Sequence, residues 1–103
     1  MNIFKRKQEV KTENQQQNPQ AVLMFMQAIE KGIVPKVKRL VNDEHITSRK
    51  IIMDKCIGTE APWRSNKLTM LMAKRMGISE ELITEKVKDV VIRELDKYQG
   101  ITD

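Results

Sequence analysis

The stretch SEELITEKVKDVVIRELDKYQG, residues 79–100, decides the fold class. Ser79 can cap a helix here, Glu80 and Glu81 stand in its first turn, where the helix dipole favours acids, and Gly100 follows. On a helical projection the apolar side chains share an arc of roughly 140°. They are Ile83, Val87, Val90, Val91, Leu95 and Tyr98. The pattern predicts an amphipathic helix over residues 80–99 that turns one face toward a core.

Upstream of this helix, glycine and proline divide the chain. Asn18 can cap a helix that has Pro19 at its first position, where a missing N–H is not needed. Gly32 is placed to end that helix, and Pro35 to begin a second one. The second helix carries a narrow apolar stripe made of Val37, Leu40 and Val41. The sequence therefore predicts two short helices between residues 19 and 42.

Two further helices are expected before residue 79. The third begins after Thr47 or Ser48 and ends at Gly58, and the fourth covers residues 66–76, up to a turn at Gly77. Residues 58–65 form an irregular linker. The apolar face of the third helix comprises Ile52, Met53, Cys56 and Ile57, and that of the fourth comprises Leu68, Leu71, Met72 and Met76.

The fold predicted from these segments is all-α. We expect a compact bundle of four to five short helices over residues 19–103, because the sequence shows no sustained strand alternation and no hairpin turn. Residues 1–18 are polar and basic with little to bury, and we expect them to form a flexible tail.

The composition points to a reducing compartment, and we expect a cytoplasmic protein. Cys56 is the only cysteine among the 103 residues, so the chain cannot form an internal disulfide. The longest apolar run covers residues 21–26 and continues at Ala28 and Ile29, which is too short to cross a bilayer. We therefore expect no membrane partner.

No motif in the sequence indicates an enzyme. Asp43, Glu44 and His45 are adjacent, but neighbouring residues on a helix point in different directions, so a solvated helix end is the better interpretation than a metal site. Cys56 lies on an apolar face, where a thiol is usually inert. Phosphate-binding and dinucleotide-binding glycine motifs are absent from the sequence. We expect no catalytic residue, no metal and no cofactor.

Positive charge is concentrated in the first three quarters of the chain. The net charge of the protein is +5, whereas residues 1–78 alone carry +8. An acidic partner is favoured by such an imbalance, either nucleic acid or an acidic protein surface, although a mixed soluble surface is an open alternative. Nine cations are the candidate nucleic-acid-binding residues: Lys36, Lys38, Arg39, Arg49, Lys50, Arg64, Lys67, Lys74 and Arg75.

Residues 73–83 have the outline of a helix-turn-helix unit. Ala73 is a small residue on the first helix, Gly77 makes the turn and Ile83 is an apolar residue on the second helix. Lys86 stands where another buried residue is usual. Glu80, Glu81 and Glu85 also oppose this interpretation, because phosphates would repel acids on a reading helix. An ordinary helical corner is the better interpretation.

Two functions follow from the sequence. The first is a small non-enzymatic regulatory protein, of the DNA-binding or transcription-regulating kind, that acts on nucleic acid or on a nucleic-acid-processing complex. The alternative is a protein–protein adaptor or inhibitor, and a homodimer is also possible, because residues 21–26 are apolar on nearly all sides. Trp63 is a candidate interface residue. Because it is a single tryptophan in a linker, we favour the interpretation that it fills the edge of the core. The candidate partner-binding residues are Val22, Phe25, Met26 and Trp63.

Overall fold

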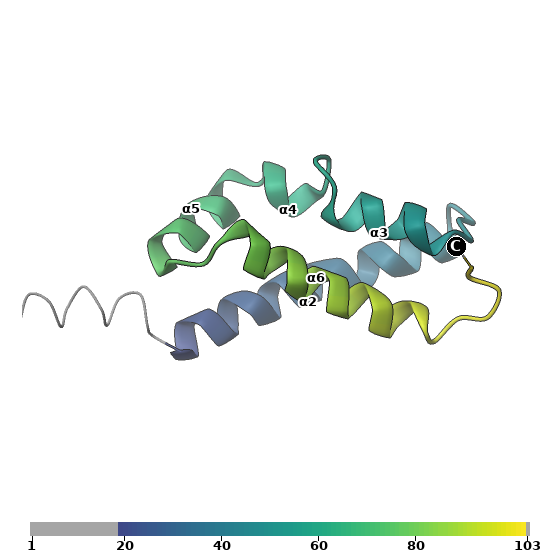
Figure 1. The fold of residues 1–103 in the computed structure, drawn as a ribbon, viewed down its shortest axis with the longest axis horizontal. Coiled ribbons are helices and arrows are strands. Elements are labelled where there is room, and N and C mark those ends of the chain that lie inside the picture. Colours follow the sequence, from purple (N-terminus) through teal and green to yellow (C-terminus); the bar gives the residue numbers. More distant parts are fainter. Residues whose placement is uncertain (1–18, 103) are drawn as a thin grey trace, which may run out of the picture.

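A computed structural model describes residues 19–102 of the chain, and two helices form its body (Figure 1). The long helix α2 (Pro19–Asn42) and the last helix α6 (Glu80–Leu95) run in the same direction and pack against each other. Helix α3 (Arg49–Ile57) returns along both of them. The one-turn helix α4 (Pro62–Ser65) and helix α5 (Lys67–Met76) then lead back to the end where α2 begins.

The amphipathic stripe of α6 supplies the centre of the core, as its sequence predicts. Five of its six predicted core residues are buried, and Tyr98, which lies beyond the helix, is half-buried. The stripe packs against buried residues of α2 and α3, which are Phe25, Ile29, Ile33, Val37, Leu40, Ile52 and Cys56. The predicted all-α bundle is confirmed, and residues 19–102 contain no β-strand beyond a single bridge between Ser48 and Thr102.

The predicted break between Gly32 and Pro35 is wrong, because α2 continues through both residues. Gly32 does not take the left-handed conformation that ends a helix; among the described glycines only Gly77 and Gly100 have positive φ. The buried residues of α2 recur every three or four positions across the proposed break. Burying one continuous stripe against α6 outweighs a local cost of roughly 1 kcal/mol for glycine and 3 for proline in a helix.

The predicted helix starts and stops between residues 48 and 79 are confirmed. The Ser48 hydroxyl accepts a hydrogen bond from the Ile51 N–H at 3.2 Å, and the Ser79 hydroxyl accepts one from the Leu82 N–H at 3.1 Å. Gly58 ends α3, and Gly77 ends α5 in the left-handed conformation with φ 73°. The linker at residues 58–65 is more regular than expected, since Pro62 opens α4 at a first helical position.

The apolar face predicted for α5 is largely wrong. Leu68, Leu71 and Met72 are 66%, 47% and 39% exposed, while Met76 is half-buried against the core. The buried residue of α5 is Ala73, and its small side chain allows close approach of the helix to the core. The side of α5 that contacts the core therefore consists of Ala73 with the partly buried Met70 and Met76, while Leu68, Leu71 and Met72 face outward.

The last helix is one turn shorter than predicted. Helix α6 ends at Leu95, and the chain then turns through residue Gly100, whose φ is 83°. This turn brings Thr102 back to the corner between α2 and α3, where its N–H donates to the Thr47 carbonyl at 2.8 Å. The Arg49 N–H donates in turn to the Thr102 carbonyl. Two tertiary hydrogen bonds thus replace the final helical turn.

The tail predicted for residues 1–18 lies outside the described residues. Within residues 19–102, no helix combines the length and the apolar character needed to cross a bilayer.

Candidate functional site

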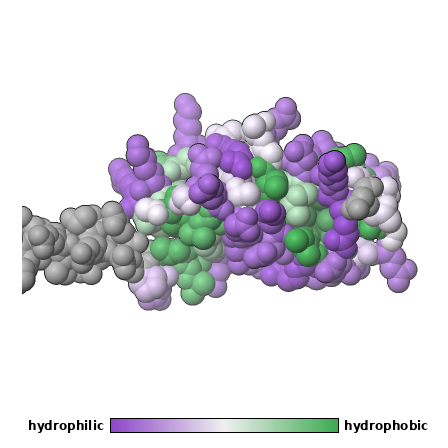
Figure 2. All heavy atoms as spheres, viewed as in Figure 1, coloured by the Kyte–Doolittle hydropathy of each residue, from purple (hydrophilic) through white to green (hydrophobic). Residues whose placement is uncertain are grey.

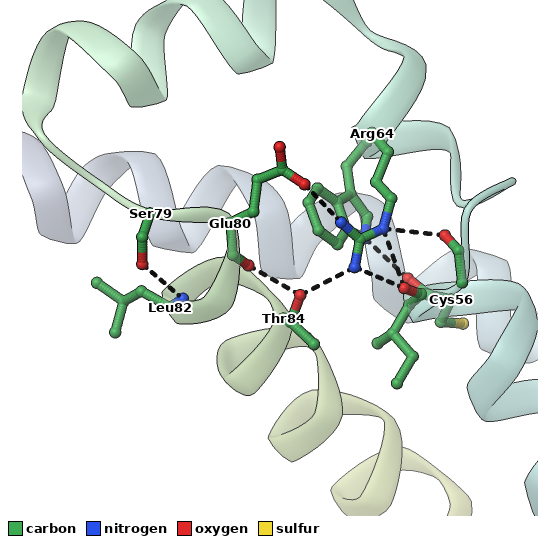
Figure 3. A network of polar contacts seen from close by, with 9 residues as sticks. Cys56, Arg64, Ser79, Glu80, Leu82 and Thr84 are labelled. Atoms are coloured by element: carbon green, nitrogen blue, oxygen red, sulfur yellow. Dashed lines mark hydrogen bonds and ion pairs between the residues drawn. The ribbon is translucent and has the colours of Figure 1, made fainter.

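Arg64 is a predicted nucleic-acid-binding residue, but its guanidinium makes hydrogen bonds to other parts of the same chain (Figure 3). Its guanidinium donates to the carbonyls of Ile57 and Gly58 at the end of α3, at distances of 2.7–3.0 Å. It also donates to the Thr84 hydroxyl at 3.0 Å and to a Glu80 carboxylate oxygen at 2.7 Å. Because five donor contacts are satisfied in this way, Arg64 ties α3 and α4 to the start of α6.

Trp63 fills the edge of the core, the interpretation that its sequence favours. The side chain is 6% exposed, and its Nε1 donates to the Cys56 carbonyl at 2.8 Å. The Arg64 guanidinium covers the ring at 4.2 Å from the centroid. A partner cannot reach this indole without moving α4.

The other candidate cations fall into separate groups. Arg49 forms an ion pair with Asp96 at 2.7 Å. Lys36 and Lys50 line a shallow groove between α2 and α3 that also contains acids, namely Glu44, Asp54 and Glu60. Lys67, Lys74 and Arg75 lie on α5, near the other end of the molecule in Figure 1. Seven of the nine make no ion pair within residues 19–102: Lys36, Lys38, Arg39, Lys50, Lys67, Lys74 and Arg75.

The predicted helix-turn-helix segment is a corner between α5 and α6. The buried face of α6 packs on α2 and α3, while Glu81, Glu85 and Asp89 remain exposed. The helix that would enter a DNA groove therefore presents acids to solvent, which disfavours phosphate contact.

The side chains considered for chemistry lie in different surroundings. His45 is exposed in the turn after α2, whereas Cys56 is fully buried on α3. Burial raises the pKa of the Cys56 thiol to about 11, with Lys36 opposing the shift, so the thiol is protonated at neutral pH. Within residues 19–102, no three His, Cys, Asp or Glu side chains come together as metal ligands.

Large apolar side chains gather on the surface at one end of the molecule. Of eight that are exposed among the described residues, six belong to the first half of α2, to α5 and to the start of α6. These helix segments lie at the same end in Figure 1, and Figure 2 shows apolar surface over the beginning of α2. We call this surface the apolar end, and it consists of Leu23, Met24, Leu68, Leu71, Met72 and Leu82.

Two apolar grooves flank the first half of α2. The groove between α2 and α6 contains Leu23 and Leu82, with Glu85 and Asp89 on its rim. The groove between α2 and α5 is lined by Met24, Met72 and Met76, among others. Exposed apolar side chains gathered in grooves of this kind often mark a binding surface.

The sequence located this surface only in part. Of the four candidate partner-binding residues, Phe25 and Trp63 are buried, while Val22 and Met26 are half-buried beside the α2–α6 groove. The sequence pattern places the exposed residues of α5 on its predicted apolar face, and Leu82 is not part of the predicted stripe of α6. A signal for both was present: α5 has more apolar positions than one face can bury, and Leu82 lies off the stripe of α6.

Comparisons with protein-family models, with curated proteins and with solved structures find no match to this chain.

Proposed function

We propose that the protein is a non-catalytic helical binding module, an adaptor or an inhibitor, that docks another protein surface on its apolar end. One observation carries the proposal: six large apolar side chains are exposed together at the end where α2, α5 and α6 meet. Interface cores are made of such side chains surrounded by a polar rim. The rim here is charged, with Lys67, Lys74 and Arg75 on α5.

The partner surface that suits α5 is apolar with acids around it. Helix α5 contains three cations and no acid, and none of the three cations forms an ion pair within the described residues. Charges of the opposite sign on a partner would speed association and align the two surfaces. A reducing compartment such as the cytoplasm is part of the proposal, supported by the single free cysteine.

The test compares two double variants of matched exposure. Leu71→Glu with Met72→Glu changes the apolar end, and Ile51→Glu with Ile92→Glu changes two exposed apolar residues elsewhere, which are 49% and 44% exposed. In affinity capture from the native host after nuclease treatment, the first variant should lose its partner, since a central apolar pair contributes about 2 kcal/mol or more, roughly 30-fold in Kd. Equal capture by both variants would refute the proposal.

A second candidate function is binding of nucleic acid, including DNA in transcription regulation. It is supported by the seven candidate cations that remain unpaired within residues 19–102. The binding constant for generic DNA or RNA should then fall steeply with added salt. Charge reversal at Lys38 and Arg39, or at Lys67 and Lys74, should weaken binding, whereas Leu71→Glu with Met72→Glu should not.

A further inference from the structure

Two surfaces at the apolar end differ in shape and in charge. One is a basic ridge on α5, and the other is an apolar groove between α2 and α6 with acids in its lining. On α5, Leu68, Leu71 and Met72 are exposed, with Lys67 before them and Lys74 and Arg75 after them along the helix. Spacings of three and four residues place the three apolar side chains on one strip of the helix. This surface is a ridge that is apolar along its middle and basic at its ends.

The groove between α2 and α6 has the complementary character. Its floor is apolar, and its lining on the α6 side includes the acids Glu85 and Asp89. Lys86 also lies there, and its ammonium is 3.2 Å from a carboxylate oxygen of Glu30, which Arg93 contacts as well. Glu85 is 3.7 Å from the Lys88 ammonium, whereas Asp89 makes no ion pair within residues 19–102. Glu81 is exposed one turn before Glu85 and adds to the acidic side. The floor is formed by Pro19, Val22, Leu23, Met26 and Leu82.

The two surfaces cannot meet within one molecule. The groove between α2 and α5 lies on one side of the first half of α2, and the acid-rimmed groove lies on its other side, against α6. Helix α2 therefore separates the α5 ridge from the acid-rimmed groove. A contact between them requires two molecules.

We infer that the occupant of the acid-rimmed groove is the α5 ridge of a second copy of this chain. The inference rests on the proposed function, because it names the partner of the apolar end. In a two-fold dimer each copy contributes one ridge and one groove, so the contact forms twice and the assembly closes without growing further. Burial of the exposed leucines and methionines drives association, and the opposite charges select the register.

Charge exchange between the two surfaces tests the inference. The ridge variant is Lys74→Glu with Arg75→Glu, and the groove variant is Glu85→Lys with Asp89→Lys. Each variant alone would place like charges across both contacts, so its dimer dissociation constant should rise more than about tenfold. In a mixture of the two variants both contacts again join opposite charges, and a heterodimer should form with near wild-type affinity.

Sedimentation equilibrium of the full chain and of both variants measures this, with circular dichroism as the check that each variant remains helical. A wild-type chain that stays monomeric up to millimolar concentration overturns the inference. A wild-type dimer that both variants leave unchanged, or a mixture that fails to form the heterodimer, also overturns it. So does a monomer that binds anionic vesicles or nucleic acid through the α5 cations.

The proposed function fails on a different result. If Leu71→Glu with Met72→Glu changes neither capture of another protein nor self-association, the apolar end is not a binding surface at all. If the wild-type chain is monomeric but that double variant loses a captured protein, the binding function stands and only the identity of the partner is wrong.

Discussion

The two halves of α2 differ in how completely the neighbouring helices cover their apolar side chains. In the second half, Ile33, Val37 and Leu40 are at most 5% exposed, because α3 and α6 both pack against it. In the first half, Leu23 and Met24 are 57% and 62% exposed, although the run around them is more apolar. The difference shows that apolar content alone does not assign a residue to the core. The first half of α2 has more apolar sides than its two neighbours cover.

The difference between the two halves of α2 is tested most directly by placing the same charged residue in each half. Val37→Asp buries a carboxylate with no partner at a fully buried position and should destabilise the fold by about 3–5 kcal/mol, a large part of the stability of a domain of this size. Leu23→Asp should change the free energy of unfolding by less than about 0.5 kcal/mol. Urea denaturation of both variants gives the answer, and a comparable loss in each would mean that Leu23 also belongs to the core.

A second comparison sets Arg64, whose guanidinium hydrogen-bonds within the fold, against Lys67, which makes no ion pair within residues 19–102. Arg64→Ala removes the contacts that join the ends of α3 and α4 to α6, and leaves the Ile57 carbonyl without this donor. The expected loss is about 2 kcal/mol. Lys67→Ala, three residues later on the exposed side of α5, should have almost no effect on the urea midpoint. Similar midpoints for the two variants would show that the Arg64 contacts do not contribute to stability.

A substitution at the boundary between the two halves of α2 should raise the stability of the protein, in contrast to those above. Gly32 is exposed in the middle of α2, and a Cβ placed there would meet nothing within 4 Å. Gly32→Ala should therefore stabilise the protein by about 0.5–1 kcal/mol, since alanine favours a continuous helix. A destabilised variant in thermal unfolding would indicate that Gly32 ends a helix after all, as the sequence suggested.

The smallest expected effect concerns pH. Hydrogen bonds from Arg93 and Lys86 on α6 hold the pKa of the Glu30 carboxyl below its ordinary value of 4.5. A group with a lowered folded pKa contributes stability above its unfolded pKa and loses that contribution as pH falls through the folded pKa. Glu30→Gln should thus be less stable than the wild type at pH 7, and the gap should close below pH 4.5. A gap that is constant from pH 7 to pH 3 would contradict this.

Features set by neighbouring residues were predicted from the sequence. The caps at Ser48 and Ser79 and the stop at Gly77 depend on a hydroxyl or a missing Cβ beside the helix end, so a few residues suffice. The apolar stripe of α6 could also be predicted, because a single face of a regular helix is buried.

Features set by distant contacts were not predicted. Gly32 and Pro35 signal a break, and only the packing of α2 on α6 overrides them. Burial of Ala73, with larger side chains outside, depends on how closely α5 approaches the core. For Arg64, the partners are carbonyls six and seven residues away and a hydroxyl on another helix, which no local pattern encodes. The candidate binding surface is predicted only in part, because the packing of the helices decides which apolar side chains of α5 and α6 stay exposed.

The pairing of Thr102 with Thr47 and Arg49 has a practical consequence for labelling experiments. It fixes the last described residues at the α2–α3 corner, and Figure 1 places this corner at the opposite end of the molecule from α5. A fluorophore or an immobilisation tag joined after this point would leave Leu71 and Met72 free. Energy transfer between such labels on two associated molecules would then report how the far ends of the pair are oriented.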